Sequence, residues 1–397
     1  MIDNAVYVAN TDIPSRMANS IQVMKNADAW ASVSRDFALL TCTTLGKHLR
    51  GNDEALREFY GLSNRFEIRT YPLHGLFSSR WQTLRELYYR FAVRWIEARR
   101  PDLVFTRSYL LPPLLPKSAP PTVVETHGLP DANPDMQVLL RAVRDGKVTA
   151  LLTIADALKR RYLDAGVPEE RVLVLPDGFD AQQFAKPLTR REAAGRLGLP
   201  SDRVVAGYVG HLYEHRGVED ILQAAAKLPE VLFLFVGGHD QDVARRRSEA
   251  EMLGLRNVRF EGFVPNARVP DYLWASDILL MPYSRTCPTA DWMSPLKLFE
   301  YMAAERAIVC SDLPSLRSVV SHDETALLAA PDSPDGLLAQ LRLLVEDAGL
   351  RDRLGRAAGA AAVQYSWERR VRRLVRHLQD RGLVTATVST PEAAVTT

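Results

Sequence analysis

The chain has 397 residues, of which 50 are Lys or Arg and 48 are Asp or Glu. One hydrophobic core stops growing at roughly 250–300 residues, so the length predicts two domains. The hydrophobic fraction of 47% and the charged fraction of 25% are those of a globular enzyme, which excludes collagen-like, coiled-coil and largely disordered classes. The even charge balance predicts no nucleic-acid partner.

Cys42, Cys287 and Cys310 are scattered, with neither a CxxC pair nor the spacing of zinc ligands. This pattern favours a reduced compartment and predicts no disulfide scaffold and no metal site. The chain begins MIDNAVYVANTDIP, which is typical of a first strand and not of a signal peptide. No run of about 18 apolar residues occurs. We therefore expect a cytoplasmic protein, at most peripheral to the inner face of the membrane.

Short apolar runs alternate with longer helical patterns along the chain, which is typical of parallel sheets built from βαβ units. In the first half we predict strands at residues 6–10, 37–42, 66–72, 102–107, 122–127, 150–154 and 171–175. In the second half we predict strands at residues 204–209, 231–236, 258–263, 278–282, 308–311 and 326–329. The fold class is therefore α/β, with two facing Rossmann-like, doubly wound parallel-sheet domains and an interdomain cleft.

We place the first domain at residues 1–185 and the second at 186–365, because a turn and a polar stretch separate the two strand series. An arginine-rich helix at 366–383 follows, and residues 384–397 are expected to form a disordered tail because they carry almost no charge and no helical stripe.

Aromatic residues recur at helical spacing between residues 80 and 100, with Trp81, Tyr88 and Trp95 on one stripe and Arg90 and Arg94 on other faces. One interpretation is an interfacial helix that meets an anionic membrane carrying a lipid-linked acceptor. The other is a core stripe with a solvated charged face, which such patterns more often represent.

A glycine-containing turn follows the predicted strand at 204–209 and precedes a helix that opens at Val218. Gly210 lets backbone approach a ligand, and the helix N-terminus favours phosphate. His211 and Arg216 lie in the same turn, and the guanidinium of Arg216 adds a positive charge with several hydrogen-bond donors. The alternative is a plain turn with Arg216 in solvent.

A second cluster follows the predicted strand at 278–282. Ser294 is predicted to cap a helix that has Pro295 at its first position. Lys297 and Glu300 then share one face of that helix, which indicates either a ligand site or an ordinary surface ion pair.

The order of these motifs, with Gly237 and the 260–264 segment between them, resembles the second domain of GT-B glycosyltransferases of the retaining family 4 type. The resemblance covers most of the chain, strongly in the second half, and it implies that the helix at 366–383 crosses back to the first domain. It implies that Gly210, Arg216 and Lys297 meet the donor diphosphate and that Glu300 takes the ribose hydroxyls. It implies further that the base lies near Gly237, Gly262 and Val264, with the donor site completed by His211, Trp292, Ser294 and Pro295.

Three positions depart from the family pattern. His211 stands where the family usually has Arg, Arg216 where it usually has Lys, and Trp292 where it usually has the first of two glutamates. A histidine is charged only near or below its pKa, so phosphate binding through His211 would depend on pH. Asp291 is a candidate replacement for the missing carboxylate.

In the first half, His127 is expected at the carboxyl end of a strand, where the resemblance implies contact with the donor sugar. A histidine there is otherwise a satisfied structural residue. The loop and helix start that contain Ser15, Arg16 and Asn19 resemble the acceptor side of the family, and the alternative is a generic polar loop.

The resemblance implies a retaining transfer of a sugar from a nucleotide-diphosphate donor to an acceptor hydroxyl, with His127, Arg216 and Lys297 as catalytic groups and no further cofactor. We expect no divalent metal, because Arg216, Lys297 and helix N-termini would stabilise the departing diphosphate. The acceptor would be a glycan, a lipid-linked molecule or a small molecule, in polysaccharide or glycoconjugate assembly. Two alternatives stay open: a non-catalytic paralogue that binds a nucleotide sugar or glycan, and a nucleotide-sugar epimerase of the same fold.

Overall fold

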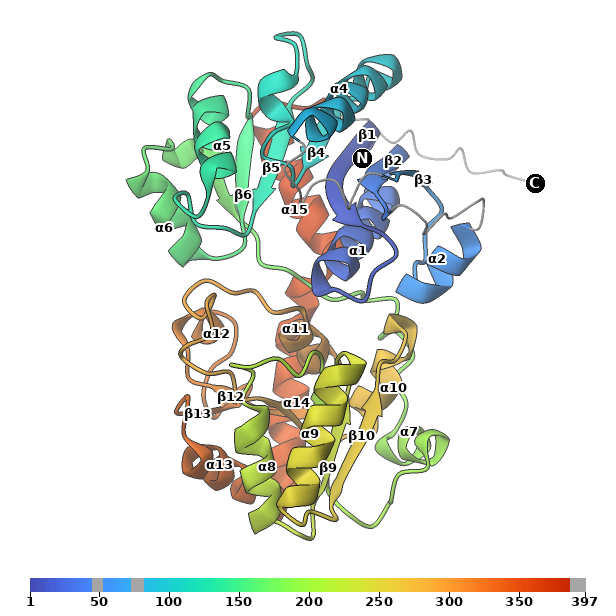
Figure 1. Ribbon diagram of the computed structural model, residues 1–397, viewed down its shortest axis with the longest axis vertical. Coiled ribbons are helices and arrows are strands. Elements are labelled where there is room, and N and C mark those ends of the chain that lie inside the picture. Colours follow the sequence, from blue (N-terminus) through green and yellow to red (C-terminus); the bar gives the residue numbers. More distant parts are fainter. Residues whose placement is uncertain (45–52, 73–81, 386–397) are drawn as a thin grey trace, which may run out of the picture. The chain divides into compact units, whose positions relative to one another are not determined.

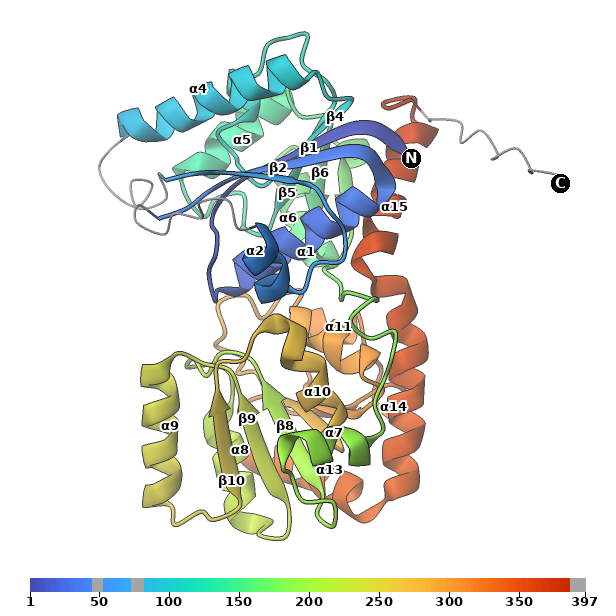
Figure 2. The same ribbon diagram turned by 90° about the vertical axis from the view of Figure 1, so that its right-hand side faces the viewer.

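The computed structural model describes residues 1–44, 53–72 and 82–385. The chain divides into two compact units. Unit 1 comprises Met1–Glu58, Leu62–Pro176 and Trp367–Thr397, and unit 2 comprises Phe59–Gly61 and Asp177–Ser366. Figure 1 shows the elements of each unit, and Figure 2 shows them turned by 90°. The change of unit after Pro176 precedes the predicted limit at residue 185, because Phe179 and Phe184 pack in the core of unit 2.

Unit 1 is built on a seven-stranded sheet with the order β3-β2-β1-β4-β5-β6-β7. Its strands are β1 (Ile2–Asp12), β2 (Ser34–Cys42), β3 (Glu67–Tyr71), β4 (Leu103–Thr106), β5 (Thr122–Thr126), β6 (Ala150–Thr153) and β7 (Val172–Val174). All neighbouring strands pair in parallel. The strand order reverses between β1 and β4, so the loops that leave these two strands flank a topological switch point.

Helices cover both faces of this sheet (Figure 2). They are α1 (Ala18–Val33), α2 (Asp53–Tyr60), α4 (Gln82–Arg99), α5 (Pro134–Arg144), α6 (Asp156–Asp164) and the last helix, α15 (Trp367–Asp380). Val6 and Val8 of β1 pack in one cluster with Tyr88 of α4. Helix α1 lies on the opposite face, where Trp30 contacts Phe105 of β4, and α1 also packs against α15.

Helix α4 buries the aromatic stripe that its sequence predicts. Tyr88 and Trp95 lie in the core, while Arg90 and Arg94 are exposed. This arrangement matches the interpretation of the stripe as part of the core with a solvated charged face. Leu87 is exposed on the same helix. Trp81 lies outside the described residues. Among residues 1–44, 53–72 and 82–385, no helix combines the length and the apolar character that a membrane crossing requires.

Unit 2 carries a six-stranded sheet with the order β10-β9-β8-β11-β12-β13. Its strands are β8 (Val205–Val209), β9 (Leu232–Val236), β10 (Val258–Gly262), β11 (Ile278–Met281), β12 (Ala307–Ser311) and β13 (Leu327–Ala329). Its helices are α7 (Arg190–Leu197), α8 (Val218–Lys227), α9 (Asp240–Met252), α10 (Val269–Trp274), α11 (Leu296–Ala303), α12 (Pro314–Arg317), α13 (Pro334–Glu346) and α14 (Ala348–Ala362).

Two hydrophobic clusters fill the two faces of this second sheet. Helices α8, α9 and α13 pack on one face, and α7, α10, α11 and α14 pack on the other. The strand order reverses between β8 and β11, which places the turns after these strands at a second switch point.

Every strand predicted from the sequence is present, with ends that differ by a few residues. The fold class is confirmed as α/β with two doubly wound parallel sheets. The predicted tail at 384–397 lies outside the described residues except for Val384 and Thr385.

Candidate functional site

Three glycines meet at the carboxyl edge of the unit 2 sheet. The Gly210 N–H donates to the Val236 carbonyl over 2.8 Å, and the Gly237 N–H donates to the Gly262 carbonyl over 2.6 Å. Gly210 and Gly237 have φ values of 135° and 103°, and a Cβ on Gly237 would lie 2.7 Å from the Gly210 oxygen. Only glycine allows this approach, so the turn after β8 and the turn after β9 form one backbone surface.

Lys297 reaches this surface from the first turn of α11. Its Nζ lies 3.9 Å from the Tyr208 ring centroid and 5.4 Å from that of Tyr283. A Cβ on Gly210 would come within 2.6 Å of Nζ, so glycine at this position makes room for the ammonium group. Nζ is buried and has no hydrogen-bond partner among the described residues. A buried donor without a partner lowers the free energy of unfolding. An anion would supply the missing acceptor and charge, so the site is complementary to an anion.

Arg216 supplies a second positive charge next to Lys297. Its guanidinium carbon lies 4.3 Å from the Tyr283 ring centroid, and Nη1 lies 3.9 Å from the Cys287 sulfur. Burial and the neighbouring Arg216 charge hold the pKa of Lys297 well below its ordinary value. Two cations therefore stand together at the switch point of unit 2, which is where doubly wound sheets bind ligands.

The N-terminus of α8 contributes less charge than its position suggests. Gly217 is its N-cap with φ 70°, and Val218 opens the helix as predicted. Glu219 and Asp220 occupy the first turn, where their carboxylates already balance the helix dipole. The positive potential of this site therefore comes mainly from the two side-chain cations.

The predicted cap of α11 is wrong by one residue. Pro295 is the N-cap, and no side chain caps the helix. The Ser294 hydroxyl instead accepts a hydrogen bond of 2.7 Å from the Asp177 N–H, which holds it away from the helix start. Lys297 and Glu300 are half-buried on one face as predicted, and Trp292 is half-buried in the preceding loop.

His211 takes part in an aromatic stack beyond the turn after β8. Its ring lies 4.7 Å from the Tyr213 ring and 5.0 Å from the His239 ring between centroids. The Tyr213 hydroxyl and His239 Nε2 are 3.1 Å apart. Val264 packs against the core of unit 2, so any contact from it to a base would come from its backbone.

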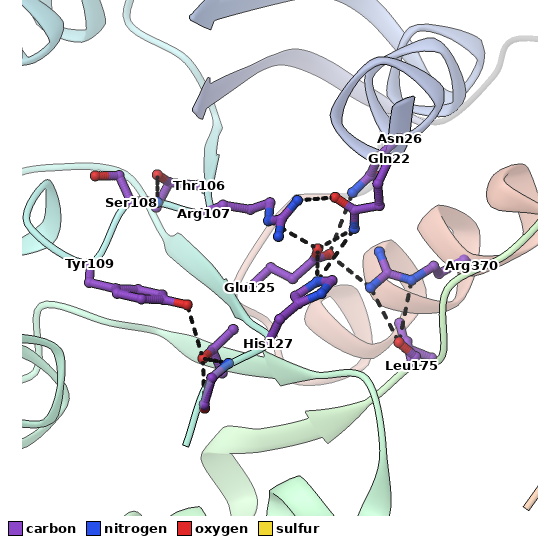
Figure 3. A network of polar contacts seen from close by, with 12 residues as sticks. Gln22, Asn26, Thr106, Arg107, Ser108, Tyr109, Glu125, His127, Leu175 and Arg370 are labelled. Atoms are coloured by element: carbon purple, nitrogen blue, oxygen red, sulfur yellow. Dashed lines mark hydrogen bonds and ion pairs between the residues drawn. The ribbon is translucent and has the colours of Figure 1, made fainter. Parts of the chain in front are cut away.

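Unit 1 holds a second polar cluster around the buried carboxylate of Glu125 in β5 (Figure 3). His127 Nε2 lies 2.8 Å from Oε1, and Arg370 Nη2 of α15 lies 2.8 Å from Oε2. The Gln22 amide of α1 donates to Oε1 over 2.6 Å, and Arg107 Nε, just after β4, lies 3.8 Å from Oε1. Burial alone would raise the pKa of Glu125, but the Arg370 charge, the hydrogen bond from His127 and the Arg107 charge hold it well below its ordinary range.

The predicted acceptor-side residues lie at the turn into α1. Ser15 Oγ accepts a 3.2 Å hydrogen bond from the Met17 N–H. Arg16 and Asn19 are exposed. This turn follows β1 and therefore borders the switch point of unit 1.

Sequence reasoning missed Glu125, Arg370 and the aromatic residues beside Lys297. The signal for Glu125 was a carboxylate next to Val123 and Val124 in a predicted buried strand, since a buried charge is kept only when it is paired. Arg370 gave no comparable signal, because it is one of several arginines in its helix.

Two family models match the chain. The model described as "Glycosyl transferases group 1" matches residues 189–360, and "Glycosyltransferase Family 4" matches residues 44–183. Together they span more than half of the sequence, and the solved structures below share its fold. The chain belongs to the group 1 glycosyltransferases with a GT-B fold.

Individual relatives agree with this assignment. A D-inositol 3-phosphate glycosyltransferase from Xylanimonas cellulosilytica is 28% identical over 237 residues, 57% of this chain and 55% of the relative. A phosphatidyl-myo-inositol mannosyltransferase from Mycobacterium tuberculosis is 29% identical over 241 residues, 58% of this chain and 59% of the relative. The chain thus spans less than two thirds of the length of these relatives.

Solved structures share the fold over nearly the whole chain. Anabaena HepE in complex with UDP superimposes with a TM-score of 0.73 at 17% identity, covering 95% of this chain and 100% of that one. Sucrose-phosphate synthase from Thermosynechococcus elongatus gives a TM-score of 0.73 at 18% identity, covering 96% and 99%.

Proposed function

We propose that this protein is an enzyme that transfers a sugar from a nucleoside-diphosphate sugar to an acceptor hydroxyl. The bond between the sugar anomeric carbon and the diphosphate oxygen breaks, and the acceptor oxygen bonds to that carbon. The acceptor proton leaves with the diphosphate. Arg216 and Lys297 stabilise the charge that develops on the departing diphosphate, so the reaction needs no divalent metal.

The observation that carries this proposal is the pair of cations at the switch point of unit 2. Lys297 has a buried ammonium without a partner among the described residues, and Arg216 stands beside it. Two adjacent positive charges match the two phosphates of a nucleoside diphosphate better than a neutral ligand. HepE, which shares the fold, was solved with UDP.

The family resemblance supplies the remaining donor contacts of this proposal. Glu300, one turn after Lys297, accepts the ribose hydroxyls, since a carboxylate can accept two vicinal hydroxyls at once. The backbone at Gly237 and Gly262 receives the base. Trp292 borders the sugar, and His127 of unit 1 contacts it.

Transfer proceeds with retention of anomeric configuration, through front-face attack assisted by the leaving phosphate. The acceptor is a glycan or a lipid-linked molecule. The Mycobacterium tuberculosis relative is named for a phosphatidyl-myo-inositol acceptor, and a Bacillus subtilis relative that is 32% identical over 158 residues is named for teichuronic acid biosynthesis. Ser15, Arg16 and Asn19 lie on the acceptor side.

A thermal-shift screen tests the donor class. UDP, GDP, ADP and dTDP are added separately, with the matching monophosphates as controls. A ligand at 100 times its Kd adds about 2.7 kcal/mol to the free energy of unfolding. We expect one diphosphate to raise the melting temperature and its monophosphate to do so much less. No response to any diphosphate would contradict the proposal.

A turnover assay with the sugar of that nucleotide then tests the chemistry. Release of the diphosphate with an acceptor glycoside, and the same anomeric configuration in donor and product by NMR, support a retaining transferase. Binding without release would indicate the non-catalytic paralogue. A changed sugar on the nucleotide without an acceptor would indicate the epimerase.

A further inference from the structure

Glu125 is surrounded by donors from four different parts of unit 1 (Figure 3). Gln22 comes from α1, Arg107 from the end of β4, His127 from the end of β5 and Arg370 from α15. Asn26 of α1 adds a longer contact of 3.5 Å to Oε2. The side chain of Glu125 is fully buried.

Stability alone does not explain this arrangement. Replacing a buried ion-pair network by packed apolar side chains is often neutral or stabilising, because desolvation offsets much of the charge attraction. Val123 and Val124, which precede Glu125 in β5, are buried and show that the strand itself accepts apolar side chains. The carboxylate is therefore better explained by what it orients.

The group that Glu125 orients is the imidazole of His127. A carboxylate oxygen only accepts, so the 2.8 Å contact between Oε1 and Nε2 requires the proton on Nε2. In the neutral ring the other nitrogen, Nδ1, is then an acceptor. The His127 side chain keeps 24% of its surface exposed, whereas that of Glu125 keeps 0%. The carboxylate thus sets both the ring plane and the tautomer from inside the fold.

Arg370 holds the carboxylate in turn. Its Nη2 donates to Glu125 Oε2 over 2.8 Å, and its Nε donates to the Pro176 carbonyl over 2.8 Å. Nη2 also lies 3.2 Å from the Leu175 carbonyl. Backbone carbonyls on one side and the Glu125 carboxylate on the other therefore fix the guanidinium. In this way Arg370 of α15 fixes the position of the Glu125 side chain.

We propose that Glu125 and Arg370 are positioning residues that hold His127 in its Nε2–H form for the transfer reaction. The last helix then contributes to turnover and not only to folding. This inference rests on the proposed function, in which His127 contacts the donor sugar.

Kinetics of Glu125→Gln, His127→Ala and the double variant provide the test. A glutamine has one accepting oxygen for the Arg370 and His127 donors, so the ring loses its fixed tautomer. We expect Glu125→Gln to lower kcat roughly 10- to 100-fold, the range seen when a group that orients a metal-bound histidine is removed, and to leave the Kd for the nucleoside diphosphate within about twofold. The double variant should be no slower than His127→Ala, because both changes remove one function.

Two further variants guard against loss of folding. Arg370→Lys keeps the charge on α15 but loses the forked geometry, and we expect a smaller fall in kcat with a melting temperature near the wild type. Arg372→Met is the matched control, since Arg372 is exposed on the same helix and pairs with Glu368. It should leave kcat unchanged.

Nitrogen NMR of His127 separates this inference from the proposed function. At a pH where the ring is neutral, the wild type should carry its proton on Nε2 and none on Nδ1, and Glu125→Gln should shift this balance. An unchanged tautomer, or kinetic losses that multiply in the double variant, would overturn the inference. If the wild type binds no nucleotide and has no turnover, the proposed function fails, while the NMR comparison still decides whether Glu125 sets the tautomer.

Discussion

Replacing Lys297 by Met removes a buried charge and keeps a similar side-chain volume. A buried donor without a partner costs about 1–3 kcal/mol, and a cation beside an aromatic ring regains roughly 0.5–2 kcal/mol. The Met sulfur regains part of the aromatic contact with Tyr208. We therefore expect Lys297→Met to raise the free energy of unfolding by about 1–2 kcal/mol, or the melting temperature by roughly 2–8 °C.

The same substitution should weaken binding of the nucleoside diphosphate. A hydrogen bond between charged partners contributes about 1.5–3 kcal/mol, which corresponds to an affinity loss of about 10- to 150-fold. Differential scanning fluorimetry and titration calorimetry measure the two effects on one preparation. Lys227→Met is the matched control, because Lys227 is an exposed lysine of unit 2 paired with Asp335. It should produce neither effect.

The stability gain should depend on pH in a defined direction. The pKa of Lys297 is lowered in the folded state, so the unfolded chain binds more protons and wild-type stability rises with pH between the folded pKa and the ordinary value of 10.5. The advantage of Lys297→Met should be full below the folded pKa and should vanish as pH approaches 10.5. A variant that melts at or below the wild-type temperature and binds nucleotide normally would refute the assignment of Lys297 as a strained anion-binding cation.

Other outcomes follow from the same site. Glu300→Gln should weaken diphosphate binding by about 1.5–3 kcal/mol through the lost ribose contact, and calorimetry with unchanged affinity would remove Glu300 from the site. Turnover should persist in excess chelator, whereas loss that magnesium restores would show a metal requirement. Trp292→Ala should weaken binding of the intact sugar donor but not of the bare diphosphate, and parallel losses with a lower melting temperature would make Trp292 a packing residue. Gly217→Ala should lower the free energy of unfolding by more than the about 1–3 kcal/mol of backbone strain alone, because a Cβ at φ 70° would lie 1.8 Å from the Pro282 oxygen. Gly254→Ala is the control, since Gly254 has φ 67° but open space around it, and it should lower the free energy of unfolding less. Equal losses in thermal melting would contradict the clash at Gly217.

Local sequence pattern was sufficient for the elements of this protein. The β-branched and aromatic runs predicted every strand, because a strand buried on both faces needs a continuous apolar segment. The start of α8 at Val218 was also predicted, from the glycine-containing turn that precedes it, and the structure places Gly217 there as a left-handed N-cap. The cap of α11 was not readable, because Ser294 bonds to Asp177, which lies 117 positions away.

The motifs around Gly210 and Lys297 could be recognised from their order, but their electrostatics could not. Whether Lys297 forms a surface ion pair or a buried cation depends on Tyr208 and Tyr283, which two other segments bring against it. Spacing along one helix determines only which side chains lie on the same face of that helix, and not whether the face is buried.

The order of the strands was also decided by the tertiary structure. Sequence alone indicated parallel βαβ units, but the reversals at β1/β4 and β8/β11 set which turns flank the ligand-binding edges. The pairing of Glu125 with Arg370 joins residues 245 positions apart. The sequence by itself determined where strands and helices form, because those patterns are local. Only the packed structure decided which charges meet, because a contact between distant residues exists only once the sheets and helices have assembled.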